Sequence, residues 1–367
     1  MRISCSFIFL SLFFLATKLS AQSPLAIGSK VPDFELQGTD GKTYRLDNFS
    51  GAPVLAIVFT CNHCPTAQAY EGKIMEIAQM ENVSVVAVSS NDPEAIRLDE
   101  LGYSDLGDTY DEMKIRAAEQ HFNFPYLYDG ATQQMAKDFG AQATPHIFIF
   151  DIHQRLQYQG RIDDTEKPGV LPKNPDAINA IKAILNGQKP AVTQTKTFGC
   201  SMKFSDKRHT AVAEKENWTK EEVSLHKLDE QGVRDLLKND SGKLRLINVW
   251  ATWCGPCVTE FPDLLTMQRM YRGRDFELVT ISADNPEAED KVLKFLKERS
   301  ASTKNFLFAG EDKYKLIEAV DPKWQGALPY TLLIEPGGNI VYAQQGIIDS
   351  AKMRKLIIEN KLMGRYY

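Results

Sequence analysis

The chain contains few cysteines, no cluster of basic residues and, beyond its N-terminus, no long apolar run. Lys and Arg number 43 against 48 Asp and Glu, which gives a formal net charge of −5. A nucleic-acid partner is therefore not expected. Without ~20 consecutive apolar residues, no segment beyond the N-terminus is expected to cross a membrane. No Gly-rich phosphate loop follows an apolar run, so we predict no nucleotide, flavin or metal cofactor.

The N-terminus has the pattern of a cleavable signal peptide. It carries a charge at Arg2, an apolar stretch from Cys5 to Ala16, and a short segment of small and polar residues that ends at Ala21. An uncleaved anchor is the alternative, but the apolar stretch is shorter than the ~20 residues that span a bilayer. We therefore expect export, to a bacterial periplasm in the simplest case, where disulfides persist.

The 367 residues exceed the usual size of one hydrophobic core, which favours two domains. Aligning Cys61 with Cys254 shows an internal repeat. The matched segments are 54–60 with 244–250, 87–95 with 280–288, and 144–151 with 328–335. In each copy, apolar runs of strand length alternate with helical patterns and end in a hairpin and a helix. We predict an α/β chain of two similar domains, each a central mixed sheet flanked by helices.

The predicted boundaries are a signal peptide over 1–21, a first domain over 22–187, a linker over 188–217 and a second domain over 218–367. The linker is rich in Lys, Thr and Ser, apart from the run Phe198-Gly-Cys-Ser-Met-Lys-Phe204. This run is similar to a Gly-Cys-x-Ile-Lys-Trp segment that follows some redoxin domains. Three interpretations of Cys200 stay open: it resolves a mixed disulfide, pairs with another chain, or is an unreactive thiol.

Four cysteines form two C-x-x-C pairs, Cys61/Cys64 and Cys254/Cys257, each just past an apolar run. At the start of a helix, the first thiol of such a pair faces unpaired backbone N–H groups, which favour its thiolate. The second thiol is near enough to close a disulfide, so the pair exchanges two electrons without a bound cofactor. A zinc half-site is the alternative, but neither copy has a second C-x-x-C or a His pair at suitable spacing.

The second pair lies in the run Asn248-Val-Trp-Ala-Thr-Trp-Cys-Gly-Pro-Cys-Val-Thr-Glu-Phe-Pro262. This run resembles the thioredoxin signature and, more narrowly, the exported TlpA and ResA group of thioredoxin-like proteins. The resemblance implies a thioredoxin-like fold from about Leu244 onward and a role for Glu260 in proton transfer. Glu260 is one helical turn beyond Cys257, so we expect its carboxylate to reach the dithiol through a water. An ordinary first-turn glutamate is the alternative.

The first pair, Cys61-Asn-His-Cys64, departs from Trp-Cys-Gly-Pro-Cys. A partly cationic His63 beside the Cys61 sulfur is expected to stabilise the thiolate and hence the reduced form. We therefore predict a higher reduction potential for Cys61/Cys64 than for Cys254/Cys257; a solvated His63 without this role is the alternative. From about Gly28 to Gly187 this copy resembles redoxins of the AhpC/TSA type, including their N-terminal hairpin.

Two x-Pro dipeptides stand at matching places in the copies, Thr144-Pro145 and Leu328-Pro329. Similarity to the thioredoxin fold implies that Pro145 and Pro329 are cis and pack against the dithiols, where the preceding residue's backbone pairs with a bound client. A trans proline at the start of a strand is the alternative. His146 follows Pro145 and is expected near Cys61, or has a structural role only.

These features favour an exported thiol–disulfide oxidoreductase, in which Cys61 and Cys254 attack and Cys64 and Cys257 resolve. The expected partners are client proteins with cysteines and an upstream thiol reductant or oxidant; the oligomeric state is open. A peroxidase acting through Cys61 is one alternative, although Val54 and Val58 replace the Pro and Thr/Ser of the peroxiredoxin frame P-x-x-x-[TS]-x-x-C. A copper carrier is the other, with Cys61, Cys64 and either His63 or His146 as ligands.

Overall fold

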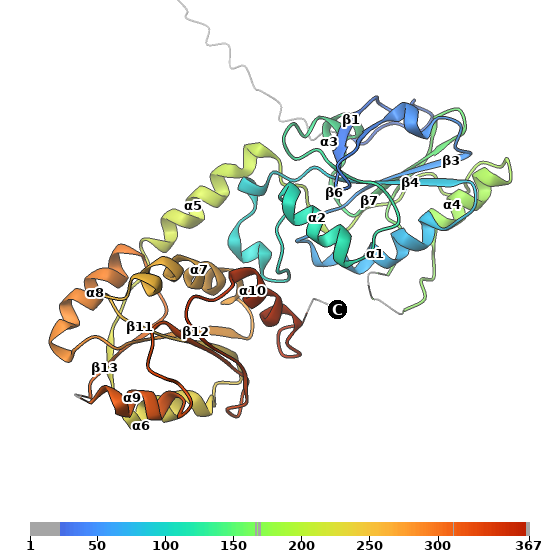
Figure 1. The fold of residues 1–367 in the computed structure, drawn as a ribbon. Coiled ribbons are helices and arrows are strands. Elements are labelled where there is room, and N and C mark those ends of the chain that lie inside the picture. Colours follow the sequence, from blue (N-terminus) through green and yellow to red (C-terminus); the bar gives the residue numbers. More distant parts are fainter. Residues whose placement is uncertain (1–22, 166, 168–169, 311, 365–367) are drawn as a thin grey trace, which may run out of the picture.

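The computed structural model describes residues 23–165, 167, 170–310 and 312–364. The predicted signal peptide lies outside these residues. Two α/β lobes lie against each other, the first coloured blue to green and the second orange to red (Figure 1). Across the described residues, no helix has both the length and the apolar character needed to cross a membrane.

The first domain is built on a seven-stranded sheet of order β2-β1-β5-β4-β3-β7-β8. Its strands are β1 (Glu35–Gly38), β2 (Thr43–Arg45), β3 (Val54–Phe59), β4 (Val83–Ser89), β5 (Tyr126–Tyr128), β7 (His146–Asp151) and β8 (Leu156–Gly160). Its helices are η1 (Leu46–Phe49), α1 (Pro65–Ala78), η2 (Pro93–Ala95), η3 (Leu98–Leu101), α2 (Tyr110–Glu119), α3 (Gln134–Phe139) and α4 (Asp176–Leu185). Strands β3, β4 and β5 are parallel, and the remaining pairs of neighbours are antiparallel.

Strand β3 is buried along its whole length because both faces of the sheet are covered. Side chains alternate between faces along a strand. Accordingly, Val54, Ala56 and Val58 join the core beneath α1 and α4. Leu55 and Phe59 join a second core that contains the buried residues of α3. This arrangement places Cys61 two residues beyond the C-terminal end of an interior strand.

The second domain contains a six-stranded sheet of order β10-β13-β12-β11-β14-β15. Its strands are β10 (His226–Leu228), β11 (Leu244–Trp250), β12 (Phe276–Ser282), β13 (Lys304–Phe308), β14 (Tyr330–Ile334) and β15 (Ile340–Gln345). Its helices are α6 (Glu230–Lys238), α7 (Gly255–Tyr271), η5 (Pro286–Ala288), α8 (Glu289–Glu298), α9 (Lys313–Val320) and α10 (Ser350–Glu359). Helices α7, α8 and α10 pack on one face, and α6 and α9 on the other.

The predicted α/β fold of two thioredoxin-like domains is confirmed. Strands β5-β4-β3-β7-β8 of the first sheet correspond in order and direction to β13-β12-β11-β14-β15 of the second. The copies differ at one edge, where an antiparallel hairpin, β1 and β2, extends the first sheet and a parallel β10 extends the second.

The segment 188–217, which we expected to be a linker, is folded for much of its length. Strand β9 (Cys200–Ser201) pairs with β6 (Ala143–Thr144) of the first domain, and Met202 is buried in that domain's core. Helices η4 (Ser205–Lys207) and α5 (Arg208–Trp218) follow. The polar composition concealed this because few apolar side chains, among them Phe198 and Met202, anchor the segment.

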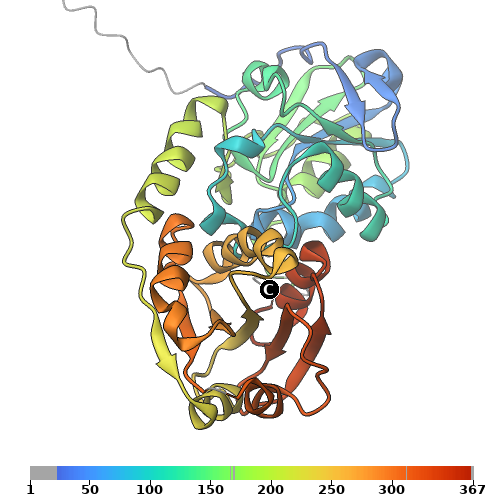
Figure 2. The same cartoon turned by 60° about the vertical axis from the view of Figure 1, so that its left-hand side comes forward.

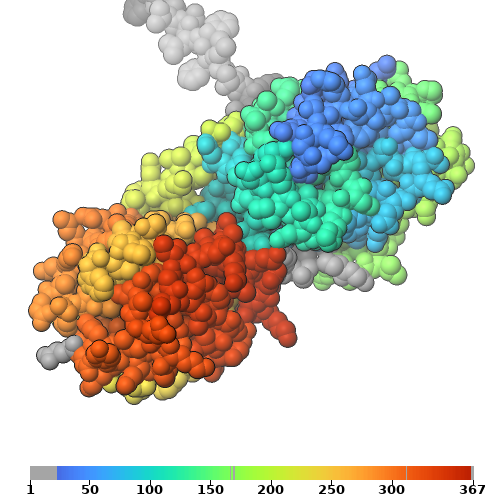
Figure 3. Space-filling model, in the orientation of Figure 1, coloured from blue at the N-terminus to red at the C-terminus, as the bar shows by residue number. Residues whose placement is uncertain are grey.

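The two lobes are in direct contact as well as joined by α5, which runs beside their junction (Figures 2 and 3). Leu98 and Leu101 of η3 pack against the second domain's core. The Tyr271 hydroxyl, at the end of α7, donates to the carbonyl of Ser104 at 3.0 Å. Arg274 donates to the carbonyl of Gly102 at 2.8 Å. The second domain therefore holds the loop that follows η3.

Candidate functional site

The second-domain pair forms a disulfide at a helix terminus. Cys254 and Cys257 are bonded, with an S–S distance of 2.01 Å. Cys254 is the N-cap of α7, and its Sγ accepts a hydrogen bond from the Cys257 amide at 3.3 Å. This geometry is the one expected from the sequence. The neighbouring Trp253 is 67% exposed, and the Gly255 and Pro256 between the cysteines are also exposed, so the disulfide lies beside an open apolar surface.

Glu260 is buried on the inner face of α7, three residues beyond Cys257. Its carboxylate accepts hydrogen bonds from the Asn248 side chain at 2.8 Å and from the Ile348 amide at 3.0 Å. Burial raises the pKa of Glu260, although these two hydrogen bonds act in the opposite direction. A carboxyl group that holds its proton to higher pH is suited to proton transfer near a dithiol.

The first-domain pair differs at the helix terminus. Helix α1 begins at Pro65, after the second cysteine, because proline favours the first helical position. Cys64 is consequently the N-cap, and its Sγ accepts from the Ala67 amide at 3.5 Å. Our expectation that the helix terminus favours a Cys61 thiolate is therefore wrong; it favours Cys64.

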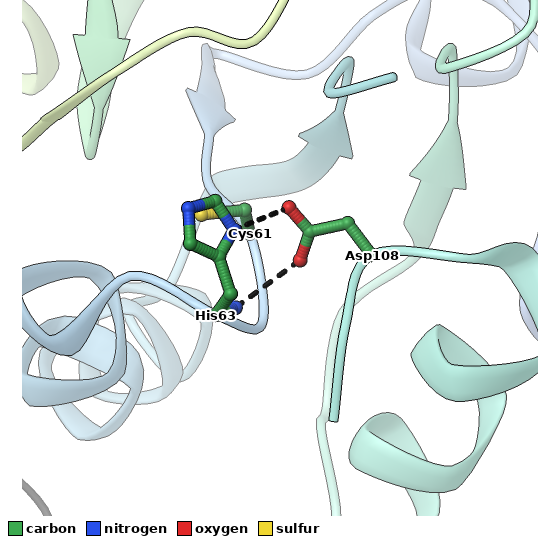
Figure 4. Close-up of side chains that lie close together, drawn as sticks. All are labelled: Cys61, His63 and Asp108. Atoms are coloured by element: carbon green, nitrogen blue, oxygen red, sulfur yellow. Dashed lines mark hydrogen bonds and ion pairs between the residues drawn. The ribbon is translucent and has the colours of Figure 1, made fainter. Parts of the chain in front are cut away.

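The loop between Cys61 and Cys64 is held by a buried carboxylate, that of Asp108. One oxygen of Asp108 accepts from the amides of Asn62 and His63, at 2.8 and 3.1 Å. The other lies 2.7 Å from the His63 Nδ1 and accepts from the Asn91 side chain at 2.7 Å (Figure 4). Three of these hydrogen bonds come from the two residues between the cysteines and so fix both of them.

Asp108 and His63 stabilise each other's charged forms. Burial disfavours the imidazolium, but the charge and hydrogen bond of Asp108 outweigh it and raise the pKa of His63. At Asp108 burial likewise opposes ionisation, and the charge of His63 with its hydrogen bonds lowers the pKa of the carboxyl group. His63 is only 1% exposed, so it is a buried side chain oriented by Asp108, which favours its protonated form, and not a solvated loop residue.

The two thiols share this environment unequally. Burial, the hydrogen bond to Cys64 and the charge of Asp108 raise the pKa of Cys61. Burial acts the same way at Cys64, but hydrogen bonds from Cys200 and Cys61 and the charge of His63 lower the pKa of Cys64 overall. The single negative charge of the reduced pair is thus drawn to Cys64, where the helix terminus also lies.

Both x-Pro peptide bonds have the predicted isomer. The peptide bonds Thr144-Pro145 and Leu328-Pro329 are cis, which confirms that part of the prediction. The Thr144 hydroxyl lies 3.2 Å from the Cys61 Sγ, and its carbonyl oxygen lies 3.4 Å from the Cys64 Sγ, from which it accepts a hydrogen bond only when Cys64 is protonated. The residue before Pro145 thus contacts both sulfurs of the first dithiol.

His146 is not part of the same cluster. Its ring packs on Phe148, with centroids 4.3 Å apart, and its Nδ1 accepts from the Gln142 amide at 3.4 Å. Burial lowers the pKa of His146 to about 4. Among the described residues, the group able to hold a metal consists of Cys61, His63 and Asp108, with ligand atoms within 4.8 Å of one another.

Sequence reasoning missed two residues of the first site, Asp108 and Thr144. A signal for the first existed: Thr109 and Glu112 form a capping box that starts α2 and so fixes the residue before it. The motif locates the helix terminus but not the loop against which it packs. Thr144 was named only as the residue before a proline, and nothing local marks its hydroxyl as a neighbour of Cys61.

A known protein family matches both halves of the chain. The model of the family described as Redoxin matches residues 26–180 and 219–357. Among solved structures, an uncharacterized conserved protein from Geobacillus kaustophilus is 33% identical, with a TM-score of 0.44, and the match covers 49% of this chain and 93% of that one.

The curated relatives match a smaller part of the chain. Thiol-disulfide oxidoreductase ResA of Bacillus subtilis is 30% identical over 118 residues, which are 32% of this chain and 62% of that protein. A ResA of Bacillus cereus is 30% identical over 138 residues, 38% of this chain and 72% of that protein. The chain thus spans less than two thirds of the first of these relatives. Because the family model matches both domains, the chain belongs to the redoxin family and is a tandem thioredoxin-like protein.

Proposed function

We propose that this protein is a thiol–disulfide oxidoreductase that exchanges electrons with the cysteines of client proteins through two dithiol centres. The observation that carries this proposal is the placement of both C-x-x-C pairs. Each pair lies at the N-terminus of the helix after the central strand, in two copies of one sheet topology. The similarity of part of the chain to ResA supports the same reaction class.

In the second domain, a client thiolate attacks the Cys254–Cys257 disulfide, or Cys254 of the reduced pair attacks a client disulfide. Cys254 is the more accessible sulfur, since it is 6% exposed and Cys257 is fully buried. The helix terminus stabilises the Cys254 thiolate, and Cys257 then resolves the mixed disulfide. Glu260 receives or supplies the proton of Cys257. The exposed Trp253 gives the client an apolar surface beside the sulfur.

In the first domain, the reduced pair carries its charge on Cys64 and its proton on Cys61. The buried His63 cation favours that thiolate and so favours the reduced form. Because a couple with a more stable reduced form has a higher potential, we propose that Cys61/Cys64 is the more oxidising of the two centres.

The test uses the full chain with one pair removed at a time, Cys61→Ser/Cys64→Ser or Cys254→Ser/Cys257→Ser. Each variant is equilibrated in glutathione buffers, quenched with acid, and its free thiols are alkylated and counted by mass spectrometry. We expect two reversible two-electron couples, with the higher potential at Cys61/Cys64. A pair that forms no disulfide at any ratio, or potentials in the reverse order, would contradict the proposal.

Trp253→Ala tests client binding separately from the chemistry. It should raise the KM for reduction of a protein disulfide and leave the potential of Cys254/Cys257 unchanged. Tyr314→Ala, which removes another exposed aromatic side chain, one that is 77% exposed on α9, is the matched control.

A second candidate function, binding of a soft cation such as Cu(I), has one specific observation in its favour. The Nε2 of His63 is buried and makes no hydrogen bond with any described residue. Its Nδ1 is held by Asp108, an arrangement that orients histidine ligands in metal sites. Stoichiometric Cu(I) bound by the reduced chain and lost in both Cys61→Ser and His63→Gln would establish this function.

We also propose that the protein acts after export, in a bacterial periplasm. The support is the signal-peptide pattern of residues 1–21. The test is the N-terminal mass of the protein recovered from a periplasmic extract, which should correspond to cleavage after Ala21. An intact N-terminus in the extract would contradict cleavage.

A further inference from the structure

The run Phe198–Phe204, here named the strap, covers the first dithiol. In its strand β9, Cys200 is the register partner of Thr144, the residue before cis-Pro145. The matching residue of the second domain, Leu328, has no strand paired with it among the described residues. In the first domain, the position beside the residue before the cis proline is therefore occupied by the chain's own strand β9. In the second domain the equivalent position is open among the described residues.

The strap brings a third sulfur to the dithiol. The amide of Cys200 donates to the Cys64 Sγ at 3.4 Å, and its side chain packs against the cluster of Cys61, Cys64 and Ala67. The two members of the pair are buried, whereas Cys200 is partly exposed. Cys200 is thus the sulfur of this cluster that is most open to solvent, and it lies against Cys64.

The strap is fixed on both sides of Cys200. At Gly199, with φ of 123°, a Cβ atom would lie 2.1 Å from the Thr144 carbonyl oxygen, so only glycine permits this approach. Beyond Cys200, Met202 is 1% exposed. The backbone of Lys203 hydrogen-bonds to Asn91, Asp92 and Gln133 at 2.8 to 2.9 Å. These contacts hold the strap in place, so they favour a cysteine fixed beside the dithiol over a segment that moves away from it.

We propose that Cys200 is a third redox-active cysteine, presented to Cys64 by the strap as an intramolecular substrate. This inference rests on the proposed function, since it requires a client disulfide to oxidise Cys61/Cys64. In the oxidised domain, Cys200 attacks the Cys64 sulfur, the Cys61–Cys64 bond breaks and a Cys64–Cys200 bond forms. The proton of Cys200 passes to the departing Cys61 sulfur, so no electrons are gained or lost.

The exchange moves the disulfide to the solvent side of the domain. A client thiolate that attacks the Cys200 sulfur displaces Cys64, which the helix terminus and His63 stabilise as a leaving group. The buried first dithiol thereby communicates with clients without opening the fold.

The test maps disulfides in the full chain carrying Cys254→Ser/Cys257→Ser. The protein is oxidised with oxidised glutathione, quenched with acid, alkylated, digested without reduction and analysed by mass spectrometry. We expect Cys64–Cys200 peptides beside Cys61–Cys64 peptides, and Cys64–Cys200 as the main product when Cys61→Ser is added. Gly199→Ala should reduce the Cys64–Cys200 product about tenfold or more, because detaching the strap lowers the effective concentration of its thiol, and should leave Cys61–Cys64 intact.

The matched control moves the thiol by one residue, Cys200→Ser with Ser201→Cys. Successive strand residues point to opposite faces, and Ser201 is exposed, so this variant should form no bond to Cys64. If the chain with Cys254→Ser/Cys257→Ser forms only the Cys61–Cys64 disulfide, both with and without Gly199→Ala, the inference is overturned but the proposed function is not. Failure of Cys200→Ser to form Cys61–Cys64 would instead count against the proposed function of this domain.

Discussion

Replacing Asp108 by Asn should make the Cys61/Cys64 couple more reducing. The amide keeps an acceptor for the backbone N–H groups of Asn62 and His63, but it presents an NH2 group where a carboxylate oxygen faced the His63 Nδ1. That NH2 group needs an acceptor, so it favours the neutral imidazole with a lone pair on Nδ1. The cation that stabilises the Cys64 thiolate is therefore lost, and the reduced form becomes less stable.

The size of the effect follows from the charge interaction. Two unit charges about 5 Å apart interact by roughly 3 kcal/mol at an effective dielectric constant of about 20. If about half of this is lost, the pKa of Cys64 rises by about 1 unit. For a two-electron couple the same loss lowers the potential by about 30 mV. The first domain should also lose stability, by roughly 1 to 3 kcal/mol, because the hydrogen bond between residue 108 and His63 no longer joins two charged groups.

The assay is the glutathione titration of the full chain with Cys254→Ser/Cys257→Ser, combined with the pH dependence of alkylation at Cys64. Asp111→Asn is the matched control, because it removes an exposed carboxylate of α2 that pairs with Lys114 and lies outside the dithiol site. Adding His63→Gln completes a double-mutant cycle. An unchanged or higher reduction potential in Asp108→Asn would refute the role assigned to His63. The same conclusion would follow if Asp108→Asn lowered the potential as much in a His63→Gln chain as in the chain with His63.

Three further predictions concern stability, each measured by urea unfolding. Glu71 accepts two hydrogen bonds from Arg116, at 2.9 and 2.7 Å. Arg116→Met should therefore lower the free energy of unfolding by about 3 to 5 kcal/mol, because the buried Glu71 carboxylate loses this cation. Adding Glu71→Met should restore most of the lost stability. Met202→Ala should cost about 2 to 5 kcal/mol by leaving a cavity beneath the strap, whereas Ser201→Ala should have little effect. Burial raises the pKa of Glu260, so its favourable contribution is present below the ordinary carboxyl pKa and lost as pH rises through the folded pKa. Glu260→Gln should abolish this loss above the ordinary carboxyl pKa, whereas Glu318→Gln, at an exposed residue of α9, should leave it unchanged.

Much of the fold was predictable because its signals are local. Apolar runs of strand length stand out in sequence, and β11 begins and ends at the residues expected. Helix α4 stops before Asn186-Gly187, a pair of residue types that commonly ends helices. The sequence repeat then related the two sheets, since matching segments fold alike. The edge strands differ between copies because each depends on what its own domain packs beside the sheet.

The strap was not predictable from local pattern. Its strand is two residues long, and its apolar anchors are too few to give a period. What holds it is the shape of the site, above all the approach of Gly199 to the Thr144 carbonyl oxygen. Asp108 was missed for a similar reason, since three of its hydrogen bonds come from Asn62 and His63, which are 46 and 45 residues away in the sequence.

The two copies differ in the exposure of the residues between their cysteines, although the cysteines of both pairs are buried. Between Cys254 and Cys257 both residues are exposed, whereas Asn62 and His63 are each 1% exposed. Burial strengthens the effect of a single charge on a thiolate, so a buried charge can shift the reduction potential of Cys61/Cys64. Burial also keeps client proteins away from these two sulfurs. The first domain meets both requirements only if a third, partly exposed sulfur connects Cys64 with solvent, and Cys200 is placed to do so. The closed geometry of the first dithiol and the fixed position of the strap are thus explained by one arrangement.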